Sequence, residues 1–165
     1  MRLARKRLPL GWLVLGALLP DLIDKPLYYG LVFATGRRGA ELGLISGSRT
    51  FGHTGLLLVF LIGMAVWSRS SAWAAIAWGD ASHLVLDLLG DAYGLIIGAG
   101  REGPSILHAI FFPALGFEFP VSPFHSVREH LMSVKNGYVL FGETLGLALL
   151  VLAWWRRRRR RAAQE

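Results

Sequence analysis

The chain has 165 residues and a mass of 18.2 kDa, which leaves room for a single domain. A mean hydropathy of +0.45 with 53% hydrophobic residues excludes an intrinsically disordered chain and is high for an ordinary soluble domain. The absence of cysteine excludes disulfides, thiolate metal sites and cysteine nucleophiles.

The formal net charge of +7 is concentrated at the two ends of the chain. Ten of the 18 basic residues lie in the basic termini, 1–7 and 156–165, and the body between them carries eight basic and ten acidic residues. The run of six arginines follows Trp154 and Trp155, which favours an anchor at the anionic cytoplasmic leaflet over a nucleic-acid site. We therefore expect membrane lipids, and no nucleic acid, as partners.

Four apolar segments follow one another along the chain, and each is near the ~20 residues that a membrane-spanning helix needs. They cover residues 8–35, 52–67, 72–98 and 137–155. A polar interruption at Pro20–Lys25 predicts that the first of these helices is broken. The sequence thus predicts an all-α integral membrane four-helix bundle in one domain, 1–165; a soluble bundle of unusually apolar helices is the alternative.

The basic termini also predict the orientation in the cytoplasmic membrane. Basic flanks stay in the cytoplasm, so both termini are expected there, which agrees with an even number of spans. The 99–136 connection then lies on the outer side. Because its residues 106–112 are apolar and several prolines follow, it is either a re-entrant or interfacial hairpin or an ordinary external loop.

Ionisable residues inside these apolar segments are costly, and each therefore marks a candidate site. In the third segment Asp80, His83, Asp87 and Asp91 fall within a strip about 80° wide on one helix face. Counting ~1.5 Å per residue from the cytoplasmic end of each segment places five groups at roughly 17–23 Å. These groups, which predict one polar layer towards the outer leaflet, are Asp21, His53, His83, Asp87 and Glu143.

Such a layer is favourable if it binds a divalent cation, which turns neighbouring carboxylates into ligands. Histidine with carboxylates and no cysteine suits zinc or manganese best. We expect one or two ions, held by Asp21, Asp24, His53, His83 and Asp87, with His108, His125 and Asp91 as possible additional ligands.

Three sequence blocks resemble the YdjM-like family of membrane-bound metal-dependent hydrolases. They are GALLPDLIDKPL (16–27), SRTFGHTGLL (48–57) and GDASHLVLDLLGDAYG (79–94); LHAIFFPALGFEFP (107–120) is a weaker fourth match. Together they cover most of the chain. The resemblance implies that Asp21 and Asp24 stand in the family's Pro-Asp motif and that Arg49 and His53 stand in its Arg-x-x-x-His-Thr/Ser motif. It implies likewise that His83 and Asp87 stand in the family's His-x-x-x-Asp motif.

Two departures from the family pattern bear on the number of ligands. Many members carry Asp-x-Asp where this chain has Asp21-x-x-Asp24, and many have a histidine at the position of Ser48. The ligand count is therefore expected to be lower here, which puts a second metal ion in doubt.

Two functional hypotheses follow. The first is a membrane-embedded hydrolase that uses a metal-activated water, with Asp80 or Glu143 as general base. Arg49 would clamp an anionic group of a lipid-like or phosphate-containing substrate at the outer leaflet. The second hypothesis is a non-catalytic metal-binding membrane protein or a small ion or proton carrier.

Overall fold

A computed structural model describes residues 8–97, 103–122, 124, 126–132 and 137–162. Within these residues the chain is 76% helical and contains no strand, so the predicted all-α class is confirmed. The chain divides into two compact units, Met1–Pro123 and Phe124–Glu165. Glu143 thus lies in a different unit from the other residues of the predicted polar layer.

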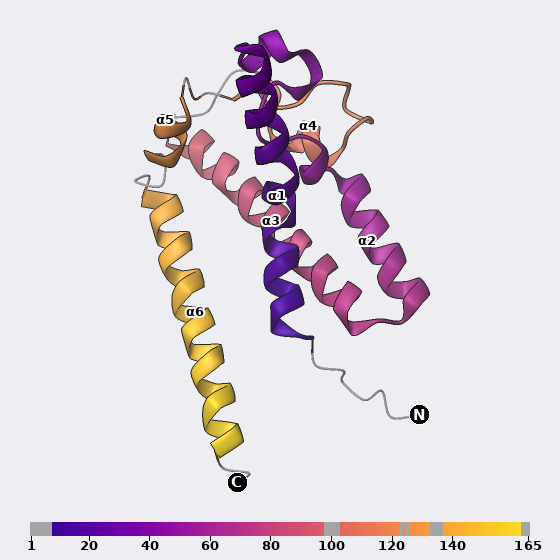
Figure 1. Ribbon diagram of the computed structural model, residues 1–165, viewed down its shortest axis with the longest axis vertical. Helices are drawn as coiled ribbons and strands as arrows, with labels where there is room; N and C mark the ends of the chain where they lie inside the picture. Colours follow the sequence, from indigo (N-terminus) through magenta and orange to yellow (C-terminus); the bar gives the residue numbers. More distant parts are fainter. Residues whose placement is uncertain (1–7, 98–102, 123, 125, 133–136, 163–165) are drawn as a thin grey trace. The chain divides into compact units, whose positions relative to one another are not determined.

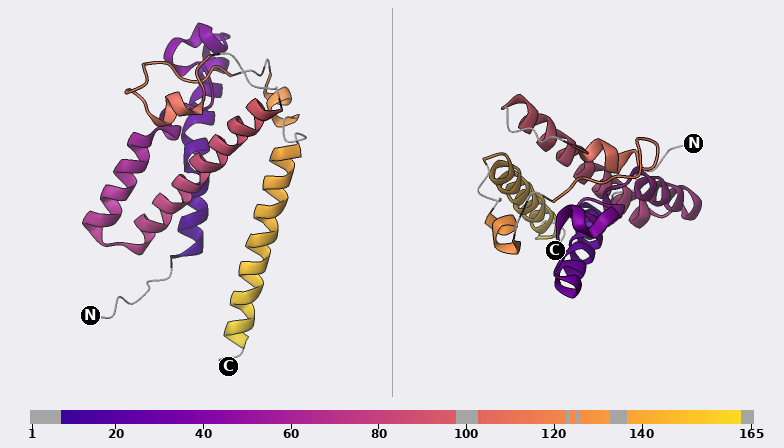
Figure 2. Two further views of the ribbon diagram at one scale, coloured as in Figure 1. Left: turned by 180° about the vertical axis from the view of Figure 1, so that it is seen from behind. Right: turned by 90° about the horizontal axis from the view of Figure 1, so that it is seen from above.

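The first unit is built around three long helices, α1 (Leu10–Thr35), α2 (Gly55–Ser68) and α3 (Ser71–Ile96). Helix α3 packs against both of the others, and it follows α2 after a tight turn (Figure 1; Figure 2). Arg69 adopts a left-handed conformation with a φ of 49° in that turn, and the Ser70 hydroxyl then caps α3 by accepting a hydrogen bond from the Ala72 N–H.

Short helical turns complete this unit. They are the 3-10 turns η1 (Gly39–Ile45) and η2 (Phe51–His53) and the one-turn helix α4 (Ile106–Ile110). The segment 103–122 packs against α3 and η2 through a cluster formed by Ile106, Ala109 and Phe119, all of which are buried. It therefore covers the loop that carries His53. Its predicted placement at the membrane stays a prediction.

The predicted break in the first helix is wrong, because α1 continues without interruption through Pro20 and Pro26. The charged residues of this stretch find partners while the helix stays intact. Lys25 pairs with Asp21 one turn earlier at 2.6 Å, and Asp24 is fully buried against the loop before α2.

Two glycines allow α1 and α3 to approach closely. A Cβ atom on Gly16 would overlap the backbone of Ile76, and one on Gly79 would overlap the carbonyl oxygen of Leu13. The crossing places the Ala17 carbonyl next to His83, with 2.7 Å between the oxygen and Nδ1. The glycine contact thus sets the position of a candidate site residue.

Replacing Gly79 with alanine should lower the free energy of unfolding by about 1–3 kcal/mol, because overpacking forces the two helices apart. The matched control is Gly63→Ala, since nothing lies within 4 Å of the position that its Cβ would take. That change should be neutral or slightly stabilising. Denaturant unfolding in detergent measures both; equal stability of the two variants would mean that the helices do not meet at Gly79.

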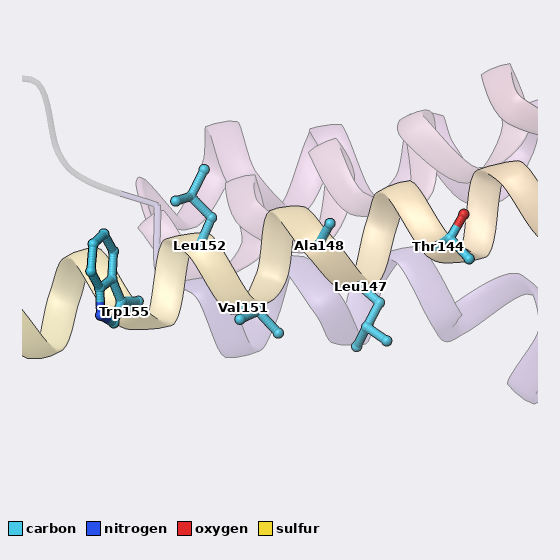
Figure 3. A pocket seen from close by; sticks show the side chains of 6 residues that line it. All are labelled: Thr144, Leu147, Ala148, Val151, Leu152 and Trp155. Atoms are coloured by element: carbon cyan, nitrogen blue, oxygen red, sulfur yellow. The ribbon is translucent and has the colours of Figure 1, made fainter.

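The second unit contains α5 (Val127–Met132) and α6 (Gly137–Ala162). Six side chains along α6 line a largely apolar hollow: Thr144, Leu147, Ala148, Val151, Leu152 and Trp155 (Figure 3). Beyond it, the Arg159 guanidinium lies 3.7 Å from the centre of the Trp155 ring, a cation–π contact. The C-terminal part of α6 therefore joins an apolar surface to a cationic end.

The four predicted membrane spans are not confirmed. Among the residues that the structure describes, no helix combines the length and the apolarity that crossing a bilayer requires.

Candidate metal centre

The buried carboxylate of Asp24 organises the loop between η1 and α2. Its two oxygens accept hydrogen bonds from the Thr50 N–H at 2.6 Å, the Thr50 hydroxyl at 2.9 Å and the Gly52 N–H at 2.8 Å. The fourth donor is His53 Nδ1, at 2.7 Å. Gly52 is required here, because a Cβ atom would lie 2.5 Å from the Pro20 carbonyl oxygen. Asp24 therefore supports His53, and hydrogen bonds engage both of its oxygens.

These contacts assign the tautomer of His53. The Asp24 carboxylate can only accept, so the Nδ1 atom of this buried ring carries a proton, and in the neutral ring Nε2 then presents a lone pair. His83 on α3 reaches the same state by another route, since its Nδ1 lies 2.7 Å from the Ala17 carbonyl oxygen, which also can only accept. A histidine that binds a metal usually donates its other ring N–H to such a carboxylate or carbonyl group.

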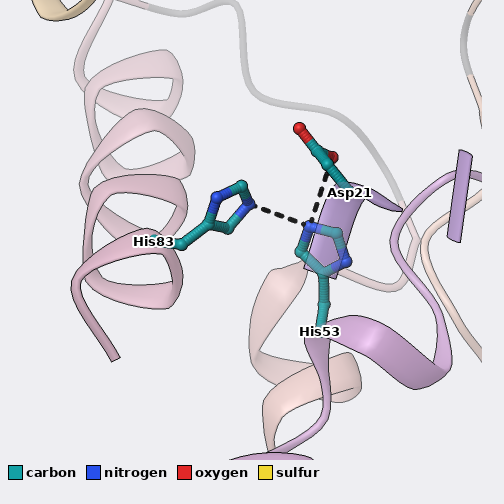
Figure 4. Close-up of side chains that lie close together, drawn as sticks. All are labelled: Asp21, His53 and His83. Atoms are coloured by element: carbon teal, nitrogen blue, oxygen red, sulfur yellow. Dashed lines mark hydrogen bonds and ion pairs between the residues drawn. The ribbon is translucent and has the colours of Figure 1, made fainter. Parts of the chain in front are cut away.

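The two Nε2 atoms face each other at 3.2 Å (Figure 4). With both rings in this neutral tautomer two lone pairs face each other, an arrangement that a shared cation stabilises, whereas a proton on one Nε2 would make the contact a hydrogen bond. Two nitrogen atoms bound ~2.0–2.1 Å from one tetrahedral zinc ion lie about 3.3 Å apart. The observed spacing therefore fits a shared metal ion.

Two carboxylates lie beside the histidine pair. Asp21 Oδ1 is 3.9 Å from His53 Nε2, and the ligand atoms of Asp21, His53 and His83 all lie within 4.8 Å of one another. Asp87 Oδ2 is 3.4 Å from His53 Nε2 and 3.9 Å from His83 Nε2. Asp21, His53 and His83 form a group that could hold a metal ion, and Asp87 borders it.

The local charge balance also favours a cation. The elements that carry the group also carry five aspartates, Asp21, Asp24, Asp80, Asp87 and Asp91, whereas Lys25 and Arg49 are the cations that pair with them in the described residues. Both oxygens of Asp80 and Oδ2 of Asp87 are buried, and no described residue gives them a hydrogen bond. Buried negative charge without such a partner costs free energy, which a divalent ion nearby would offset.

Arg49, predicted as a substrate clamp, contacts two carboxylates of its own chain. Its Nη2 donates to Asp87 Oδ1 at 3.1 Å, and its Nη1 donates to Asp91 Oδ1 at 3.0 Å. Asp91 is thus joined to the arginine and is not at the histidine pair. Asp80 lies on α3, one turn before His83, and is fully buried.

The remaining predicted residues are not part of the described group. His108 caps α4, where its Nδ1 accepts a hydrogen bond from the Ser105 N–H at 3.1 Å. His125 lies outside the described residues. Glu143 belongs to α6, and its side chain lies outside the described part of the chain.

Three residues that hold the site were not identified from the sequence. Lys25 was detectable, because it stands four residues after Asp21, a spacing at which helical side chains of opposite charge pair. Thr50 lies inside the Arg49–His53 motif, but nothing in the sequence pairs it with Asp24. Ala17 acts through its backbone carbonyl, which no residue pattern can indicate.

The comparisons with known proteins gave one match. A model of the YdjM inner membrane protein family matches residues 2–158. No curated protein and no solved structure matches the chain.

Proposed function

The chain belongs to the YdjM inner membrane protein family, and we propose that it is a membrane-embedded, metal-dependent hydrolase. The observation that carries the proposal is the pair of Nε2 atoms of His53 and His83, 3.2 Å apart, with carboxylates beside them. In the proposal Asp21 and Asp87 complete the ligand set around one divalent ion, zinc or manganese. Asp24 is assigned to holding His53, since four hydrogen bonds occupy its oxygens.

The distribution of polar and apolar side chains supports a location within the membrane. Asp24, His53 and Asp80 are buried, whereas large apolar side chains are exposed, including Trp67 at 81% and Ile96 at 83%. Soluble monomers rarely combine a polar interior with so much apolar surface, whereas intramembrane ionisable groups face the protein interior. We place the four apolar segments in the cytoplasmic membrane with both basic termini in the cytoplasm.

Each part of the site has a role in the proposed reaction. A divalent ion bound by the two histidines would polarise the substrate oxygen and acidify the attacking water. The proposed general base is Asp80, whose oxygens are not engaged by any described residue. Lys25 flanks the group and is partly exposed, which favours an anionic, phosphate-containing lipid over a neutral ester.

The test is a hydrolysis assay on detergent-purified protein. After chelation and reloading with Zn²⁺ or Mn²⁺, we expect hydrolysis of bis(p-nitrophenyl) phosphate or of phosphatidic acid presented in vesicles. We expect no hydrolysis of p-nitrophenyl butyrate. EDTA and the His83→Ala change should each remove the activity. Metal binding without hydrolysis of any of these probes would contradict the enzymatic proposal.

One observation favours the second candidate, a proton or ion carrier. A buried carboxylate without a hydrogen-bond donor, such as Asp80, is also what intramembrane proton relays use. Proteoliposomes that enclose a pH-sensitive dye distinguish the two functions. Proton flux that depends on Asp80, without hydrolysis, would identify the carrier.

Replacing Asp80 with asparagine should raise stability and abolish turnover while metal binding persists. Removing an unpaired buried charge should raise the free energy of unfolding of the metal-free protein by about 1–3 kcal/mol. Glu118→Gln is the matched control, because it makes the same chemical change at an exposed position. Thermal unfolding, metal content and turnover are measured together; an Asp80→Asn variant that is both less stable and fully active would contradict both roles.

A further inference from the structure

A series of ion pairs leads from the candidate metal ligands to the start of α4. The Arg49 guanidinium bridges two carboxylates that stand one turn apart on α3, Asp87 and Asp91, with Nη···O distances of 3.1 and 3.0 Å. The other oxygen of Asp91 accepts a hydrogen bond from the Ile106 N–H at 3.0 Å. The guanidinium is thus fixed between α3 and α4.

This bridge sets the direction of the Asp87 carboxylate. Its Oδ1 takes the hydrogen bond from Arg49, while Oδ2 lies 3.0 Å from Nε of the same guanidinium. Oδ2 is buried, and among the described residues it receives no hydrogen bond. The same atom faces the His53 and His83 Nε2 atoms, at 3.4 and 3.9 Å. A planar guanidinium that contacts both oxygens fixes the plane of a carboxylate, which a lysine ammonium cannot do.

We propose that Arg49 is a positioning residue, which aims Oδ2 of Asp87 at the histidine pair and makes Asp87 the fourth donor of the metal site. Asp91 holds the guanidinium in place and links it to α4 through the Ile106 N–H. The inference rests on the proposed metal site and replaces the substrate-clamp role expected for Arg49. Arginine acts on the metal ion through Asp87, and its partner carboxylates leave it no role in binding the substrate.

The test is a double-mutant cycle on zinc affinity, measured by competition with a chromophoric chelator. Because Arg49 acts from outside the ligand shell, Arg49→Gln should weaken Zn²⁺ binding by about 10–100-fold. Arg49→Lys should restore little of this loss. In an Asp87→Asn background, Arg49→Gln should change the affinity by no more than about twofold, which is the scatter of independent sites. Arg37→Gln, at an exposed arginine, should bind zinc like the unaltered protein.

The outcomes separate this inference from the metal site itself. The positioning role would be overturned if Arg49→Gln protein bound zinc as tightly as the unaltered protein. It would also be overturned if Arg49→Gln lowered zinc affinity equally with and without the Asp87→Asn change. Failure of the unaltered protein to bind Zn²⁺ would overturn the metal site as well. Thermal unfolding of each metal-free variant checks that it folds. Asp91→Asn leaves the Arg49–Asp87 contact in place, so it should lower zinc affinity less than Arg49→Gln does.

Discussion

Asp24→Ala protein should fail to reach the folded state. The change leaves four buried donors without their acceptor, namely the Thr50 N–H and hydroxyl, the Gly52 N–H and the His53 Nδ1–H. Each unsatisfied buried donor costs about 1–3 kcal/mol, so the combined loss approaches the whole stability of a typical domain, about 5–15 kcal/mol. The loss of folded protein is measured by the yield after membrane extraction, by elution in size-exclusion chromatography and by thermal unfolding in detergent.

Asp21→Ala is the matched control for this prediction. Asp21 is three residues away on the same helix, is partly exposed, and pairs through Oδ2 with Lys25 at 2.6 Å. A partly exposed ion pair of this kind contributes about 0–1 kcal/mol, so Asp21→Ala should fold although its metal affinity falls. Asp24→Ala protein as stable as Asp21→Ala protein would show that the Asp24 hydrogen bonds do not hold the loop.

Replacing His83 with alanine should remove stoichiometric metal binding from a protein that still folds. The side chain is partly buried and contacts only the Ala17 carbonyl oxygen and His53 Nε2 by hydrogen bond among the described residues, so its loss costs little stability. As a direct ligand it should matter more than a supporting residue, and zinc affinity should fall by more than about 100-fold. His53 is a less suitable target, because its removal also leaves Asp24 without a partner.

His108→Ala controls for the general effect of losing an imidazole. His108 caps α4 through Ser105 and also tests its predicted role as an additional ligand. Metal per protein after dialysis against a fixed concentration of free zinc is the measurement. Equal metal content in the His83→Ala and unaltered proteins would contradict the assignment of His83, and a loss in His108→Ala would extend the ligand set to α4.

The sequence indicated three residues that the structure brings together, Asp21, His53 and His83. Asp80, His83 and Asp87 share one face of α3, and the expectation that Asp21 and His53 lie at the same depth agrees with the contacts between them and His83. Helical periodicity places such side chains because it depends only on the backbone. The family match over residues 2–158 likewise confirms the resemblance that these motifs indicated.

The division of roles within the site could not be predicted in the same way. Asp24 and Asp87 are both carboxylates on the site face, but only the loop at 50–53 determines that Asp24 accepts four hydrogen bonds. Arg49 was expected to face the substrate, yet two carboxylates of α3 engage it. Partners of this kind depend on how a loop folds back on a helix, which residue types do not reveal. The predicted roles of Glu143 and His125 stay predictions.

The most direct test of the central claim is nitrogen NMR of protein labelled with ¹⁵N at histidine, titrated with Zn²⁺ in detergent. In the metal-free protein we predict that His53 and His83 both carry their proton on Nδ1, with unprotonated Nε2 atoms. Zinc should shift the two Nε2 resonances together and reach saturation at one equivalent, while His108 stays unchanged. Zinc shifts at Nδ1, or shifts of one histidine without the other, would contradict a metal ion shared between these two side chains.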